Sequence, residues 1–163
     1  MLIRRRRFAL ASGLVGVLLP FCTWGEGINC KDIVMISNDS EERGKELRSS
    51  LEHECARLRD TKTLRPGPLG NDVANVVAEY IPVGTAFSDA ESSLRSAGFT
   101  VYPRPSANPP GNRPDRFAVE AIMDTLYRSP AYNVQAIVVL NPPSPRDYSR
   151  IASILAGLFV ISM

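Results

Sequence analysis

The sequence has few of the residues that most often carry catalysis or hold metal ions. Among its 163 residues there is one histidine, His53, and there are three cysteines. A Ser-His-Asp triad would have to use His53, which lies in a charged segment without a serine motif. Gly-x-Ser-x-Gly, P-loop, His-Glu-x-x-His and paired Cys-x-x-Cys motifs are all absent from the sequence. We therefore predict a protein that is not an enzyme and that binds no metal and no cofactor.

Carboxylates are the one catalytic residue type that is plentiful. Most of them fall between residues 39 and 60, where they are typical of the solvated face of a helix. Glu120 and Asp124 share one face of a predicted strand, but the strand rise places them about 13 Å apart. That distance is too long for the paired carboxylates of a glycosidase. A hydrolase with an unrecognised site stays open as an alternative.

The net charge of the chain is also small, and its excess of basic residues comes from one short N-terminal segment. Four of the 19 basic residues are the arginines at positions 4 to 7. Without them, 15 basic residues face 17 acidic ones, which gives a net charge of −2. A nearly neutral domain gives no support to nucleic-acid binding.

The first 25 residues have the three parts of a secretory signal peptide. Arginines at 4 to 7 form the basic part, residues 8–24 are apolar, and Thr23 and Gly25 supply small residues before a cleavage site. We predict that cleavage leaves residues 26–163 as a single domain in the periplasm or outside the cell. The alternative is an anchor formed by the uncleaved segment. Its apolar run of about 17 residues is at the short limit for spanning a bilayer, and Pro20 interrupts it.

Cleavage would remove Cys22 and leave two cysteines, Cys30 and Cys55. In an oxidising compartment two cysteines predict one disulfide, which would stabilise the fold by about 3 kcal/mol in the chain-entropy model. A metal pair and a catalytic thiol are the alternatives. His53 precedes Cys55 by two positions, and residues at that spacing point to different faces of a helix. The disulfide is therefore the preferred prediction.

The first half of the mature chain has helical patterns. Residues 39–60 predict a helix after an irregular lead, with one apolar stripe formed by Leu47, Leu51, Cys55 and Leu58. After a loop at 61–70, shorter apolar periods predict helices at 73–80 and 87–97. Gly98 is well placed to end the last of them.

The second half has strand patterns. Residues 99–102, 116–128 and 134–140 predict strands, the last two joined as a hairpin. The apolar tail at 148–163 suits a buried strand, with a helix as the alternative. Five prolines between 103 and 114 predict a long loop, either functional or a tolerated insertion. Helices followed by strands predict an α+β fold, in which N-terminal helices pack on one face of a small antiparallel sheet in two layers.

One segment resembles a motif of known bacterial envelope domains. Residues 84–99 are similar to the pattern Gly-x-[Ser/Thr]-x-x-x-Ala-x-x-x-Leu-x-x-x-Gly-[Leu/Phe], with Gly84, Ala90, Leu94 and Gly98 in register. The pattern occurs in PASTA domains, which implies binding to cell-wall peptides. It occurs also in the SmpA/OmlA family of outer-membrane assembly lipoproteins and their relatives of β-lactamase-inhibitor-like fold, which implies protein binding. The order of helices and strands fits the inhibitor-like fold better.

A group of tyrosines and arginines around the proline-containing turns is the candidate interaction surface. Tyrosine and arginine are common anchors at protein interfaces. The alternative is that each tyrosine closes the end of the sheet with its hydroxyl in water. The candidate residues are Tyr127, Arg128, Tyr132, Arg146, Tyr148 and Arg150.

Together these observations predict an exported, non-catalytic protein-binding module of the bacterial envelope, inhibitor-like or assembly-factor-like. Its partner would be another envelope protein. A cell-wall ligand-binding module of PASTA type is the first alternative, with cell-wall fragments as the ligand. The hydrolase is the second.

Overall fold

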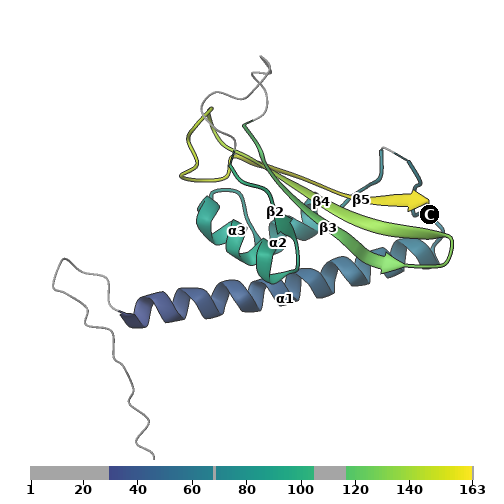
Figure 1. Ribbon diagram of the computed structural model, residues 1–163, viewed down its shortest axis with the longest axis horizontal. Helices are drawn as coiled ribbons and strands as arrows, with labels where there is room; N and C mark the ends of the chain where they lie inside the picture. The colour runs from purple at the N-terminus through teal and green to yellow at the C-terminus, as the bar shows by residue number, and fades with distance from the viewer. Residues whose placement is uncertain (1–29, 68, 105–116, 163) are drawn as a thin grey trace, which may run out of the picture.

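In the part of the chain that the structure describes, three helices form one layer and an antiparallel sheet forms the other (Figure 1). The computed structural model describes residues 30–67, 69–104 and 117–162, with side chains from Asp39 onward. The predicted signal peptide and most of the proline-rich loop lie outside the described residues. The helices are α1 (Cys30–Asp60), α2 (Ala74–Tyr80) and α3 (Phe87–Ser96). The α+β prediction is confirmed.

The sheet has five strands in the order β1-β5-β4-β3-β2, and every neighbouring pair is antiparallel. Three ten-residue strands form its centre, and two-residue strands flank them. The bounds are β1 (Asn71–Asp72), β2 (Thr100–Val101), β3 (Val119–Arg128), β4 (Tyr132–Asn141) and β5 (Ser153–Ser162). The predicted hairpin of β3 and β4 is confirmed.

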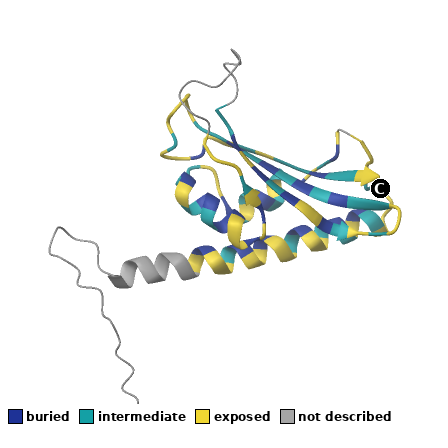
Figure 2. Ribbon diagram, in the orientation of Figure 1, coloured by how far each residue is buried: buried dark blue, intermediate teal, exposed yellow. Residues whose placement is uncertain are grey.

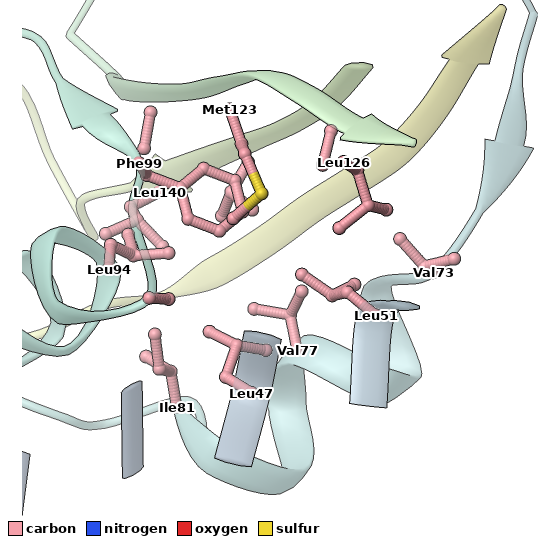
Figure 3. Packing of buried hydrophobic residues seen from close by; sticks show 14 of the residues in the cluster. Leu47, Leu51, Val73, Val77, Ile81, Leu94, Phe99, Met123, Leu126 and Leu140 are labelled. Carbon is pink, nitrogen blue, oxygen red and sulfur yellow. The ribbon is translucent and has the colours of Figure 1, made fainter. Parts of the chain in front are cut away.

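The core lies between the two layers. The predicted stripe of α1, from Leu47 to Leu58, is buried, while the opposite side of that helix is exposed (Figure 2). Leu47 and Leu51 meet Val77 of α2, and Met123 and Leu140 of the sheet close the cluster from the other side (Figure 3). Burial of such side chains stabilises by roughly 1.5–3 kcal/mol each relative to leaving them exposed. One inward-facing row per element therefore holds the two layers together.

β3 departs from the predicted alternation at its second half. Val119, Ala121 and Met123 face the core as expected. The register then shifts between Met123 and Tyr127, and Leu126 within this irregularity is buried with the core, although Glu120 and Asp124, at alternate positions before it, are exposed. From Met123 to Tyr127 β3 advances four positions, while β4 advances two, from Ala136 to Val134, so β3 contains two extra residues here. Tyr127 and Arg128 therefore keep the earlier alternation, opposite Val134 and Asn133. Sequence periodicity did not show this bulge.

The disulfide predicted between Cys30 and Cys55 is not seen in this structure, in which Cys55 is a free, buried thiol. The irregular lead predicted at 26–38 is helical from Cys30, so both cysteines belong to α1. Residues 25 positions apart on a helix are separated by roughly 37 Å, whereas bridged Cα atoms lie about 4–7 Å apart. Burial raises the pKa of the Cys55 thiol above its ordinary value.

The C-terminal strand confirms the strand prediction for the apolar tail, but β5 is not buried on both faces. Only Leu158 of this strand is fully buried. Its neighbours Ile154, Ala156 and Val160 pack partly against the core. The alternate residues of β5 face away from all three helices.

Candidate functional site

The six predicted interaction residues do not form one surface. Tyr127, Arg128 and Tyr132 lie at the β3–β4 turn, whereas Arg146, Tyr148 and Arg150 lie in the connection from β4 to β5. These two connections are at opposite ends of β4, which is about 30 Å long for its ten residues. The two groups therefore belong to separate regions of the molecule.

Tyr148 and Arg150 attach the β4–β5 connection to the helical layer. The Tyr148 ring packs edge-on against Phe87 with 5.2 Å between centroids, and its hydroxyl donates to the Phe117 carbonyl oxygen at 2.9 Å. Burial raises the pKa of the Tyr148 hydroxyl. Arg150 donates from Nη1 to the Gly84 carbonyl oxygen at 2.9 Å. These contacts favour the structural alternative for this pair, in which the side chains fix a connection.

Arg104, which the sequence did not single out, reinforces the same region. Its Nε donates to Glu91 Oε1 at 2.7 Å, and its guanidinium carbon lies 5.5 Å from the Tyr148 ring centroid. The same carbon lies 5.7 Å from the centroid of Phe87. Glu91 is a buried carboxylate on α3, so its charge is satisfied mainly by Arg104. The cluster couples the end of β2 to α3 and the β4–β5 connection.

The other end of the sheet has a basic groove beside the C-terminus of α1. Its volume is about 330 Å³. We use the name basic groove for the six residues that line it: Arg59, Lys62, Leu64, Pro66, Tyr132 and Val160. The charged side chains in this set are both cationic, and the other four give it apolar and aromatic walls.

The turn after α1 places the two cations. The Lys62 amide donates to the Arg59 carbonyl oxygen at 3.0 Å and the Thr63 amide to that of Leu58 at 2.8 Å, which is a Schellman ending. Lys62 has φ +56°, in the left-handed region where glycine is the usual residue. Pro66 then forms a bridge with Val160, which brings the loop alongside β5.

Arg59 is held against the aromatic residues of the hairpin. Its guanidinium carbon lies 4.8 Å from the Tyr127 ring centroid, and the Tyr127 and Tyr132 rings are 6.0 Å apart. Hydrogen bonding to Asp60 is the main cause that raises the pKa of Arg59 above its ordinary value. Hydrogen bonding to Tyr127 raises the pKa further. Two of the predicted interaction residues, Tyr127 and Tyr132, thus meet two cations that the sequence analysis missed. The tyrosines and the cations are brought together because the β3–β4 turn packs beside the C-terminal end of α1.

The face of the sheet away from the helices carries a second candidate surface. Strand register places Val139 opposite Leu155, Ile122 opposite Ile137, and Gln135 opposite Phe159 on this face. Leu155 is 62% exposed and Ile161 43% exposed. The three helices that the structure describes lie on the other side of the sheet (Figure 1). We name this the outer apolar patch, formed by Ile122, Ile137, Val139, Leu155, Phe159 and Ile161.

A glycine in β5 shapes this patch. A Cβ added at Gly157 would lie 2.8 Å from Cε2 and 2.9 Å from Cζ of Phe159. The Phe159 ring therefore lies down over Gly157 along the strand, as aromatic rings do over glycines in sheets. The ring covers a gap that a side chain at 157 would fill and widens the apolar surface.

Acidic side chains border the outer apolar patch on β3. Glu120 is paired with Val139 in register, and Asp124 Oδ1 accepts a hydrogen bond from Gln135 Nε2 at 2.9 Å on the same face. Arg128 lies farther along, opposite Asn133 at the end of the strand. The long side of the patch is therefore acidic, with a basic residue at one end.

The described part of the chain contains no cluster of three or more His, Cys, Asp or Glu side chains placed to hold a metal ion. Within the same residues, no helix has the length and apolar character needed to cross a membrane. The fold and these surfaces define a two-layer α+β protein with helices on one face of its sheet. No family model matches the chain, and no curated protein or solved structure matches it significantly.

Proposed function

We propose that this chain is an exported, non-catalytic protein-binding module of the bacterial envelope that contacts its partner through the outer apolar patch. The observation that carries the proposal is the exposure of Leu155 and Ile161 beside other apolar residues on a sheet face that no described helix covers. Contiguous apolar surface of this kind is typical of protein-interaction sites on soluble domains. Export rests on the sequence of residues 1–25.

The border of the patch defines the chemistry of the partner. Glu120 and Asp124 lie along one side, and no lysine is present on the outer face of β3, β4 or β5. An apolar protein surface with basic groups at its rim complements this arrangement. Charges at a rim mainly affect the association rate and the choice of partner, while the apolar centre supplies affinity.

Photo-crosslinking from two positions tests this proposal. A photoreactive amino acid is placed in the full chain at position 155 or at position 83, because Leu155 and Val83 have matching exposures of 62% and 60%. Val83 lies between α2 and α3, away from the outer face. We expect one envelope protein, identified by mass spectrometry, to be crosslinked from position 155 only. Crosslinking from position 83 alone, or equally from both positions, would contradict the proposed surface.

The cell-wall alternative is tested in parallel with isolated peptidoglycan. The protein-binding proposal predicts that neither the full chain nor its Leu155→Gln variant sediments with peptidoglycan. Sedimentation that is strong and insensitive to the substitution would support a PASTA-type module instead.

A further inference from the structure

We infer that the basic groove is a binding site for a small anionic molecule, a carboxylate on a short apolar body. This inference does not depend on the proposed function, because the groove lies at the end of α1 on the helical side of the sheet. The inner residues Val134 and Val160 are paired, which places the groove wall on the face opposite the outer apolar patch.

The first step of the argument is charge complementarity. Arg59 and Lys62 line the groove, and none of its other lining residues is an aspartate or a glutamate. Arg59 is paired with Asp60 through a 3.1 Å contact between Nε and Oδ1. Lys62 makes no ion pair with any residue of the described chain. A carboxylate in the groove would therefore gain an ammonium partner that the fold itself does not use.

The second step is the fit of an apolar body. Leu64, Pro66 and Val160 form an apolar wall, and the Tyr132 ring forms another side. A volume of about 330 Å³ is at the small end of the range for ligand sites, about 300–1,000 Å³. The loop after α1 and strand β5 enclose this space from two sides. A small free molecule with a short apolar chain can enter it, whereas the flat surface of a membrane cannot.

The third step is the backbone of Lys62. A lysine at φ +56° occupies a left-handed conformation that is strained for residues other than glycine. Glycine at this position of the Schellman turn would be more stable. A strained backbone that presents an unpaired cation at a groove indicates a functional use for the side chain.

Binding of octanoate to the full chain, followed by two-dimensional NMR, tests the inference. We expect saturable shifts confined to the amides of the groove, and an affinity for 1-octanol that is roughly tenfold weaker. The N-terminal segment is common to all variants, so differences between variants report on the groove. Equal affinities for octanoate and octanol would overturn the inference, as would shifts elsewhere in the chain only.

Lys62→Gly is the decisive variant, because it removes the ammonium and relieves the left-handed strain. We expect its unfolding midpoint to rise while its affinity for octanoate falls roughly three- to tenfold. Lys45→Gln is the matched control, since Lys45 pairs with Glu41 on the surface of α1 away from the groove. Unchanged affinity in Lys62→Gly would overturn the inference. So would binding that is seen only with vesicles of phosphatidylglycerol and not with octanoate.

Discussion

The Arg59 guanidinium carbon lies 4.8 Å from the centroid of the Tyr127 ring, and this contact joins the last turn of α1 to the end of β3. The two residues are 68 positions apart in the chain. A cation over an aromatic face contributes about 0.5–1 kcal/mol at a partly exposed site. The contact also fixes one wall of the basic groove.

Replacing the ring tests the contribution of this contact. Tyr127→Leu should lower the free energy of unfolding by about 0.5–1 kcal/mol, because Arg59 loses the aromatic face. Tyr127→Phe, which keeps the face, should retain most of the stability. Urea denaturation measures both variants. Equal losses in the two would show that the ring face contributes nothing.

Gly44 of α1 lies so close to α3 that replacing it by alanine should destabilise the fold. A Cβ at this position would lie 2.5 Å from Ser96 Cβ and 2.6 Å from the Ser93 carbonyl oxygen. Glycine to alanine inside a helix usually stabilises by about 0.5–1 kcal/mol. Here Gly44→Ala should destabilise by about 1–3 kcal/mol, because the helices must separate. Thermal unfolding measures this variant beside the control Ser49→Ala, which changes an exposed position of α1. An unfolding midpoint for Gly44→Ala above that of the wild type would contradict the close packing of α1 and α3.

Arg104 should stabilise the fold through Glu91. Arg104→Met keeps the apolar stem but removes the 2.7 Å bond to a buried carboxylate. We expect a loss of about 1 kcal/mol in chemical denaturation, since Arg95 at 3.4 Å partly replaces the lost partner. Lys45→Met, which breaks an exposed surface pair, should leave stability unchanged. A loss in the control as large as in Arg104→Met would argue against a special role for Glu91.

The Cys55 thiol should be present and protected. It is 2% exposed, and burial raises its pKa. In the folded chain Cys55 should resist alkylation at neutral pH, and in denaturant without reductant it should be alkylated fully. Because its folded pKa is raised, the protonated form is favoured, and stability should fall as the pH rises through the thiol range. A Cys55 peptide that stays unmodified until reduction would show that a disulfide forms.

Much of the fold followed from local patterns. The apolar stripe of α1, the glycine after α3 and the hairpin of β3 and β4 all depend on residues close together in sequence, and the structure confirms them. Gly98 has φ +96°, as expected of a residue that ends a helix. The start of α1 was placed too late because residues 30–38 lack a clear helical stripe. The predicted disulfide came from the number of cysteines and the expected compartment, and neither shows that both cysteines lie on one helix.

The surfaces could not be predicted in the same way. The sequence predicts a buried strand for the apolar tail at 148–163, in which both sets of alternate residues from 154 to 161 are apolar. Only the strand order shows that one set faces away from the helices. Similarly, the proposed role of Lys62 depends on its left-handed backbone and on its position beside Tyr132 in the groove, and Tyr132 lies 70 positions later in the chain. Neither relation has a local signal in the sequence.

The central claim is that the outer apolar patch binds a partner protein, and quantitative capture tests it most directly. Three full chains are immobilised: the wild type, Leu155→Gln/Ile161→Gln, and Val83→Gln as the matched exposed control. The account predicts that one identified envelope protein is retained by the wild type and by Val83→Gln. It predicts that retention by the double variant falls at least tenfold, with its unfolding midpoint unchanged. Equal retention by the double variant and the wild type would contradict the account.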